Sequence, residues 1–227
     1  MRNVNANNTV GNLVQNVETV RTVTARIVVQ KENSFWVLYG QHDKPTFLED
    51  AGNGQKLQRD VALKHVKNWR VCLDIGSNIG QWTRPLARKF KSVICFEPNP
   101  NFRECFSKNI VEHNVILWPY GLSDKVHSAN QQFNSTVLNE GEGDIECKTL
   151  DSFKLTNVDF VKIDVDGFEV PLLKGAKETL QRNNPVVNIE MKYDKRRHIA
   201  TECVRILKDF GYKYVTRTKS DEIWVKS

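Results

Sequence analysis

The chain has 227 residues, with 33 Lys and Arg against 27 Asp and Glu, a formal net charge of +6, and 40% hydrophobic residues. Eleven Phe, five Trp and five Tyr exclude an intrinsically disordered chain, and the length predicts one folded domain with an appendage. The positive charge is spread along the chain except at residues 192–198, so we interpret it mainly as solubility, with weak support for an acidic substrate.

Neither a membrane span nor a signal peptide is predicted. No run approaches the ~18 consecutive apolar residues that a span needs, and residues 1–8 lack the apolar core of a signal peptide. The five cysteines form no C-x-x-C pair, and Cys72 and Cys95 lie in apolar, strand-like runs. We therefore expect a cytoplasmic protein with reduced, buried thiols rather than disulfides or a zinc cluster.

The first 69 residues divide into two predicted segments. Residues 1–20 contain six Asn and predict a polar tail. Residues 21–69 contain two β-rich runs around a turn at 31–33, and then a helical pattern with Leu57 on its apolar side; these three elements are 22–30, 34–39 and 57–66. We interpret the second segment as a β-hairpin and helix, and as a candidate cap of the cleft in the domain that follows.

From residue 70 to residue 227, short apolar runs alternate with amphipathic stretches. The predicted strands are 71–75, 92–96, 115–120, 158–163 and 186–189, and the predicted helices are 81–90, 101–113, 170–182 and 198–210. This alternation predicts an α/β fold with a parallel sheet covered by helices on both faces. Runs 212–217 and 222–225 predict a terminal antiparallel hairpin, so the open sheet is mostly parallel. Residues 123–148 are predicted as a loop whose length suggests a function.

The clearest motif is a glycine-containing turn that follows the first of these strands and opens a helix. Gly76 and Gly80 allow the backbone to approach a ligand, and the helix N-terminus offers free N–H groups to a negative group. Glu97 ends the next strand ~20 residues later, where a carboxylate can accept hydrogen bonds from both ribose hydroxyls. The two features together predict a nucleoside ligand.

The same turn indicates which nucleoside is bound. Asn78 and Gln81 stand where the dinucleotide fingerprint G-x-G-x-x-G has its second and third glycines, which disfavours NAD and FAD. S-adenosylmethionine (SAM) suits this turn, because its carboxylate complements the helix N-terminus and its ammonium group complements acidic or carbonyl partners.

These residues resemble the FkbM family of SAM-dependent methyltransferases, whose fold is the Rossmann-like class I methyltransferase fold. The resemblance covers about residues 70–192 and rests on the segments 73–80, 96–98, 122–124, 149–153, 161–169 and 172–176. One departure is Asp166, where the family more commonly has Glu. The resemblance implies a SAM-dependent methyltransferase domain over residues 70–227 that methylates a hydroxyl oxygen of a small molecule or sugar.

The resemblance also implies which residues contact SAM. They lie in four places along the sequence: Asp74, Gly76, Ser77, Asn78, Gly80 and Gln81 near the methionine half; Glu97 at the ribose with Pro98 beside the adenine; Leu122, Ser123 and Asp124 at the adenine edge; and Asp164 at the cleft.

Three carboxylates are candidates for the catalytic groups. Asp164 and Glu190 end two neighbouring predicted strands, whereas Asp166 begins the next helix and suits the helix dipole equally well. Methyl transfer to a hydroxyl requires removal of a proton, either by a carboxylate base or with the help of a divalent cation that carboxylates hold. Both routes use Asp164 and Glu190 and the sequence leaves both open; we assign no metal ligands.

Two other functions remain as alternatives. A nucleic-acid methyltransferase would suit the isoelectric point of about 9.0, although the Asn/Asp-Pro-Pro-Tyr/Phe motif of amino-directed enzymes is absent after the fourth strand. A non-enzymatic SAM-binding or interaction module would keep the cofactor site without an acceptor pocket. The sequence carries no specific nucleic-acid signal and predicts no membrane partner, and it does not indicate the oligomeric state.

Overall fold

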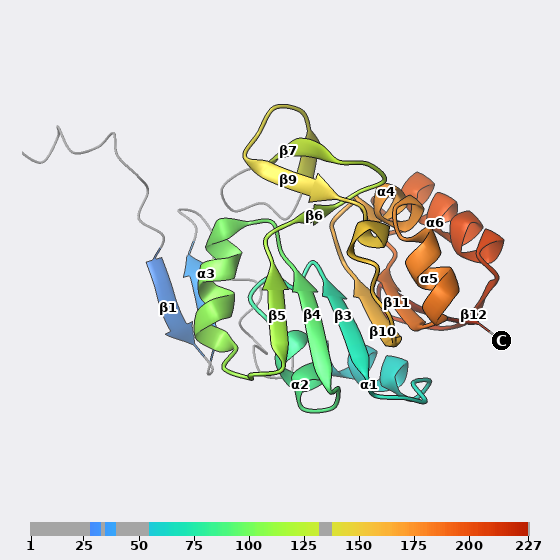
Figure 1. Cartoon of the computed structure of the whole chain (residues 1–227), viewed down its shortest axis with the longest axis horizontal. Coiled ribbons are helices and arrows are strands. Elements are labelled where there is room, and N and C mark those ends of the chain that lie inside the picture. The colour runs from blue at the N-terminus through green and yellow to red at the C-terminus, as the bar shows by residue number, and fades with distance from the viewer. Residues whose placement is uncertain (1–27, 33–34, 40–54, 132–137, 227) are drawn as a thin grey trace, which may run out of the picture.

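The protein is described by a computed structural model that covers residues 28–32, 35–39, 55–131 and 138–226. Its centre is a seven-stranded sheet of order β12-β13-β11-β10-β3-β4-β5 (Figure 1). Five of these strands are parallel: β3 (Val71–Ile75), β4 (Ser92–Phe96), β5 (Val115–Trp118), β10 (Val158–Ile163) and β11 (Val186–Glu190). β12 (Tyr212–Thr218) and β13 (Asp221–Lys226) run antiparallel. The predicted parallel sheet with a terminal antiparallel hairpin is confirmed.

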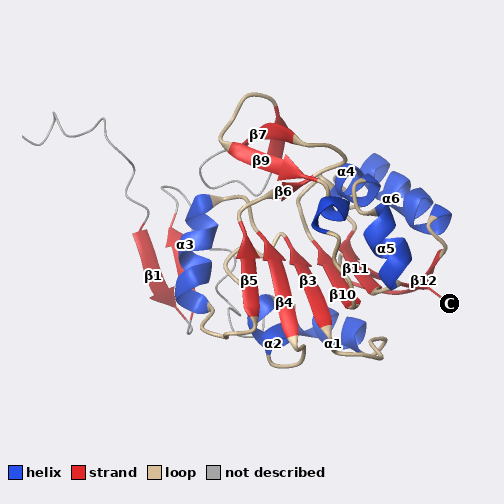
Figure 2. Cartoon of the chain, viewed as in Figure 1, coloured by secondary structure: helices blue, strands red, loops and turns tan. Residues whose placement is uncertain are grey.

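Helices cover both faces of the sheet, as predicted (Figure 2). Alternate residues along each strand face opposite sides of the sheet and contribute to two hydrophobic cores, so that Leu73 packs in one core and Cys72 in the other. The first core contains side chains of α4 (Glu169–Lys174), α5 (Lys177–Asn183) and α6 (Arg197–Asp209). The second contains those of α1 (Lys56–Leu63) and α2 (Thr83–Ala87). Because α1 shares this second core, the helix of the N-terminal segment packs directly on the sheet.

Two predicted helices differ from the observed ones. The predicted helix 170–182 is divided into α4 (Glu169–Lys174) and α5 (Lys177–Asn183). Gly175 lies between them, and a Cβ there would lie 2.0 Å from the Ser123 carbonyl oxygen, so this position requires glycine. The helix α1 spans Lys56–Leu63, and Leu57 is exposed on it. The buried side of α1 instead carries Gln58, Arg59, Ala62 and Leu63.

The segment predicted as a long loop is largely a second sheet, so that prediction is wrong. Its order is β6-β9-β7-β8, from β6 (Gly121–Leu122), β7 (His127–Gln131), β8 (Leu138–Glu140) and β9 (Ile145–Lys148). Ile145 and Cys147 alternate with polar residues and pack with Ala129 and Leu138 in a core of their own. The many polar residues around these few apolar positions conceal the strand pattern. The small sheet lies above the carboxyl ends of the main strands (Figure 1).

The predicted N-terminal hairpin is present as β1 (Val28–Glu32) and β2 (Phe35–Tyr39). Pairing continues to Glu32 opposite Phe35, so residues predicted as the turn belong to β1, while residues 1–27 lie outside the described part of the chain. The hairpin packs against α3 (Pro100–Asn109). Asn109 joins the two, because its side chain accepts from the Trp36 backbone N–H at 2.5 Å and donates to the Trp36 carbonyl at 2.9 Å.

Two further expectations concern the state of the cysteines and the absence of a membrane-spanning helix. All five cysteines are buried and free, as predicted. Among the helices in the described ranges, none has the length and apolar character that a bilayer crossing requires.

Candidate active site

A cavity of about 310 Å³ lies at the carboxyl edge of the main sheet, below the small sheet. This volume is within the ordinary range for a small-molecule site, and the position is the one where open α/β sheets bind ligands. Ten of the predicted site residues line the cavity: Gly76, Ser77, Asn78, Gln81, Glu97, Pro98, Leu122, Asp164, Asp166 and Glu190. The fold therefore brings together residues that are more than one hundred positions apart in the sequence.

The glycine-containing turn is held tightly against the ends of β4 and β10. Gly76, Asn78 and Gly80 have φ angles of +75°, +50° and +93°, in the left-handed region that favours glycine and tolerates asparagine. A Cβ at Gly76 would lie 1.9 Å from the Asp164 carbonyl oxygen, and the N–H groups of Gly76 and Ser77 donate to the Phe96 carbonyl. Gly80 faces Ile110 instead of the cavity, so its small size serves packing.

Glu97 is a buried carboxylate in the cavity wall. It accepts hydrogen bonds from the backbone N–H groups of Asn78 and Asn99, at 2.8 and 2.9 Å. Burial raises the pKa of Glu97 to about 7, although these two hydrogen bonds lower it. The contact with Asn78 links this acid directly to the glycine-containing turn.

A buried lysine connects the turn with the end of β10. The Nζ atom of Lys162 donates to the Gly76 carbonyl at 2.8 Å and lies 3.6 Å from a carboxylate oxygen of both Asp74 and Asp164. Asp74 is fully buried, and its other oxygen accepts from the Thr83 hydroxyl at 2.6 Å. Burial lowers the pKa of Lys162, but the surrounding carboxylates more than offset this and hold it above its ordinary value. Lys162 is therefore a cation shared by the two sides of the cavity.

The three predicted catalytic carboxylates come together at the ends of β10 and β11. One oxygen each of Asp164, Asp166 and Glu190 lies within 4.8 Å of the others. The Nζ atom of Lys192 bridges two of them, at 2.5 Å from Asp166 and 2.7 Å from Glu190. Burial and the charge of Asp164 raise the pKa of Glu190 to about 7, against the lowering effect of Lys192. A carboxylate with such a pKa can accept a proton near neutral pH.

Four predicted site residues lie outside the cavity lining. Asp74 is enclosed by Lys162 and Thr83, and Gly80 is packed on α3. Ser123 is wholly buried, with its backbone N–H donating to the Lys148 carbonyl, and Asp124 is exposed. Both follow β6, which pairs with β9, and neither lines the cavity.

Several lining residues are absent from the site predicted by sequence: Gln55, Tyr120, Leu138, Lys162, Phe168 and Lys192. Lys162 stands two positions before Asp164, and Lys192 stands two positions after Glu190. In an extended chain, residues two positions apart point to the same side, so this spacing could have identified the two lysines. Leu138 carries no such signal, because only the folding of the small sheet brings it to the cavity.

The carboxylate group offers oxygen ligands of the kind that Mg²⁺ accepts, so its chemistry fits a divalent cation. However, the Lys192 ammonium already neutralises two of the three carboxylates. The cluster therefore also fits a proton-accepting role without a metal.

Comparison with known proteins identifies the chain. The model of the methyltransferase FkbM domain matches residues 74–214, which is more than half of the chain. The chain belongs to the FkbM methyltransferase family. Membership implies a SAM-dependent methyltransferase, and the three predicted catalytic carboxylates lie within the matched region.

Relatives of known sequence and structure agree with this family. The hexuronic acid methyltransferase AglP of Haloferax volcanii is 28% identical over 186 residues, which cover 75% of this chain and 72% of AglP. The crystal structure of methyltransferase FkbM from Methylobacillus flagellatus superimposes with a TM-score of 0.52 at 17% identity, over 70% of this chain but only 44% of that one. The precorrin-6y C5,15-methyltransferase of Geobacter metallireducens gives a TM-score of 0.51 at 15% identity, over 82% and 94% of the two chains. The two structures support the class I methyltransferase fold.

Proposed function

We propose that this FkbM-family protein transfers a methyl group from SAM to a hydroxyl oxygen of a sugar or a related small molecule. The observation that carries the proposal is the pairing, in one cavity, of a nucleoside-type half around Glu97 with an acidic half around Asp164 and Glu190. The similarity to a hexuronic acid methyltransferase supports a sugar as the acceptor.

The first half of the cavity fits SAM. Glu97 would accept hydrogen bonds from the ribose hydroxyls, Pro98 and Leu122 would contact the adenine, and the turn from Gly76 to Asn78 would approach the methionine part. When bound there, SAM supplies an electrophilic methyl group carried on a sulfonium.

The second half would activate the acceptor. Glu190 would take the proton of the acceptor hydroxyl while that oxygen attacks the methyl carbon, and the electron pair of the broken carbon–sulfur bond would stay on sulfur. Asp164 would face the sulfonium side, where its negative charge complements the cofactor. Because the pKa of Glu190 is about 7, a substantial fraction of the group is ionised at neutral pH and most of it at higher pH, where it can serve as the base.

The test is methylation of a panel of acceptors with SAM that carries a labelled methyl group. The panel contains neutral glycosides, hexuronic acids, RNA and a protein extract, and each labelled product is then treated with mild alkali. A hexuronic acid offers both hydroxyl and carboxylate oxygens, and only a methyl ester is released by alkali. We expect alkali-stable label in the sugar fraction.

Three results would contradict the proposal. Label released by alkali would indicate carboxylate methylation, and label in RNA or protein would indicate another acceptor class. Absence of SAM binding in calorimetry would remove the proposed cofactor.

A further inference from the structure

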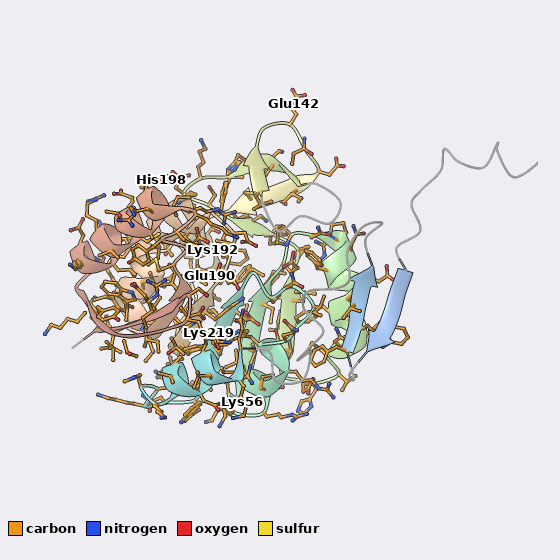
Figure 3. All side chains as sticks on the ribbon, turned by 180° about the vertical axis from the view of Figure 1, so that it is seen from behind. Lys56, Glu142, Glu190, Lys192, His198 and Lys219 are labelled. Atoms are coloured by element: carbon orange, nitrogen blue, oxygen red, sulfur yellow. The ribbon has the colours of Figure 1, made fainter. Side chains whose placement is uncertain are left out.

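Lys192 holds a position between the proposed base and the cavity. It is the second residue after β11, lines the cavity, and its side chain is 28% exposed. Its Nζ atom is 2.7 Å from the Glu190 carboxylate (Figure 3). A hydroxyl oxygen that donates its proton to Glu190 therefore lies within reach of this ammonium group.

The ammonium group has a donor to spare within the part of the chain that the structure describes. Lysine carries three N–H donors; one is donated to Asp166, and Glu190 is an ion-pair partner at 2.7 Å. The pKa of Lys192 stays well above its ordinary range, because hydrogen bonds and ion pairs with these acids outweigh burial. Lys192 is thus a permanent cation at neutral pH and cannot itself be the base.

A second cation helps to fix this arrangement. Arg196 lies 3.4 Å from the same oxygen of Asp166 that Lys192 contacts. Asp166 itself has a φ angle of +50°, in the left-handed region that glycine, asparagine and aspartate adopt more readily than other residues. The turn after β10 thereby directs the Asp166 carboxylate to Lys192, which identifies Asp166 as a positioning residue.

We propose that Lys192 is a further catalytic residue, whose ammonium group donates a hydrogen bond to the acceptor oxygen while Glu190 takes the proton of that oxygen. The inference rests on the proposed function. The hydrogen bond strengthens as Glu190 removes the proton and negative charge develops on the oxygen, so it stabilises the partly deprotonated oxygen more than the neutral hydroxyl. Lys192 remains protonated throughout, and the acceptor proton ends on Glu190.

The test uses sinefungin, a SAM analogue in which a carbon bearing an ammonium group replaces the methylated sulfur. This ammonium projects toward the position of the acceptor oxygen, whereas S-adenosylhomocysteine places nothing there. Calorimetry gives the Kd of both ligands, and the ratio of the two Kd values reports the charge at the acceptor position without any acceptor. Lys192→Met removes a repelling cation, so we expect sinefungin to bind about tenfold more tightly relative to S-adenosylhomocysteine.

Two control variants distinguish this role from a structural one. Lys192→Arg keeps the charge and should leave the ratio near the parental value. Lys195→Met removes an exposed lysine three positions away and should also leave it unchanged. If Lys192→Met does not fold, lysine methylene NMR of the parental protein replaces it; sinefungin should then shift the Lys192 resonance more than S-adenosylhomocysteine does.

The outcomes separate the inference from the function on which it rests. An unchanged ratio in folded Lys192→Met, or equal shifts with the two ligands, overturns the role of Lys192 while leaving the methyltransferase intact. Failure of the parental protein to bind S-adenosylhomocysteine would overturn the proposed function and this inference with it.

Discussion

The two halves of the cavity each contain a glutamate whose pKa is raised to about 7, but the groups that contact the two carboxylates differ. Glu97 accepts hydrogen bonds from two backbone N–H groups and is almost fully enclosed. Glu190 faces charged side chains, with Asp164 and Lys192 as the nearest. Fixed backbone dipoles hold an acid in one orientation, which suits binding, whereas neighbouring charges allow a proton to be gained and lost, which suits catalysis. Substitutions in each half of the cavity test this contrast between binding and catalysis.

Glu190→Gln should lower kcat by ~10²–10⁴-fold and leave the Kd of SAM near the parental value, because the amide cannot accept the acceptor proton. Turnover with an identified acceptor and calorimetry with SAM measure the two quantities. Parental turnover with SAM bound would show that another group, such as Asp164, activates the acceptor.

Lys162→Met should destabilise the protein by ~3–5 kcal/mol, because it leaves Asp74 buried without its cation and disconnects the two halves of the cavity. Urea denaturation measures the free energy of unfolding. The matched control is Lys174→Met, at an exposed lysine, which we expect to be nearly neutral. Similar stability of the two variants would show that the Lys162 ion pairs contribute little.

Glu97→Ala should weaken SAM binding, since each lost charge-assisted hydrogen bond typically costs ~1.5–3 kcal/mol, while kcat at saturating SAM should change less. Glu97→Gln should have a milder effect because it retains an acceptor oxygen. Glu104→Ala, which removes an exposed acid on α3, serves as the control. If both Glu97 variants bind SAM like the parent, Glu97 supports only the turn.

The pH dependence should separate the two glutamates. Glu190 must be ionised to take a proton, so kcat should rise up to tenfold per pH unit below about 7 and level off above it. The Kd of SAM should also improve with rising pH through about 7, as Glu97 ionises. Glu97→Gln should flatten only the binding profile. A kcat independent of pH between 5 and 9 would contradict a base with a pKa of about 7.

Removal of divalent cations should have the smallest effect. The Lys192 ammonium already lies on two of the three clustered carboxylates, so we expect EDTA to leave turnover within about twofold. Loss of activity with EDTA and its recovery with Mg²⁺ would instead assign Asp164, Asp166 and Glu190 to a metal.

The N-terminal hairpin and the small sheet show where sequence patterns mislead. The hairpin is predicted from β-rich runs, and with the helix that follows it we expected a candidate cap of the cleft. Its described residues contact α3 and are absent from the cavity lining, whereas Gln55, at the start of α1, lines the cavity. The small sheet is missed as a sheet, yet its residue Leu138 reaches the cavity. Local patterns report strand formation, but long-range packing decides which surface a strand covers.

Local sequence patterns were enough to predict the parallel sheet, the turn from Gly76 to Gly80 and the positions of Glu97, Asp164 and Glu190 at strand ends. These features depend on local periodicity and on the rule that the carboxyl ends of parallel strands share one edge. The contact of buried Asp74 with Lys162 and the position of Lys192 between Asp166 and Glu190 became known from the folded arrangement. The role of a charged group depends on its partners and its burial, and neither can be read from spacing along the chain.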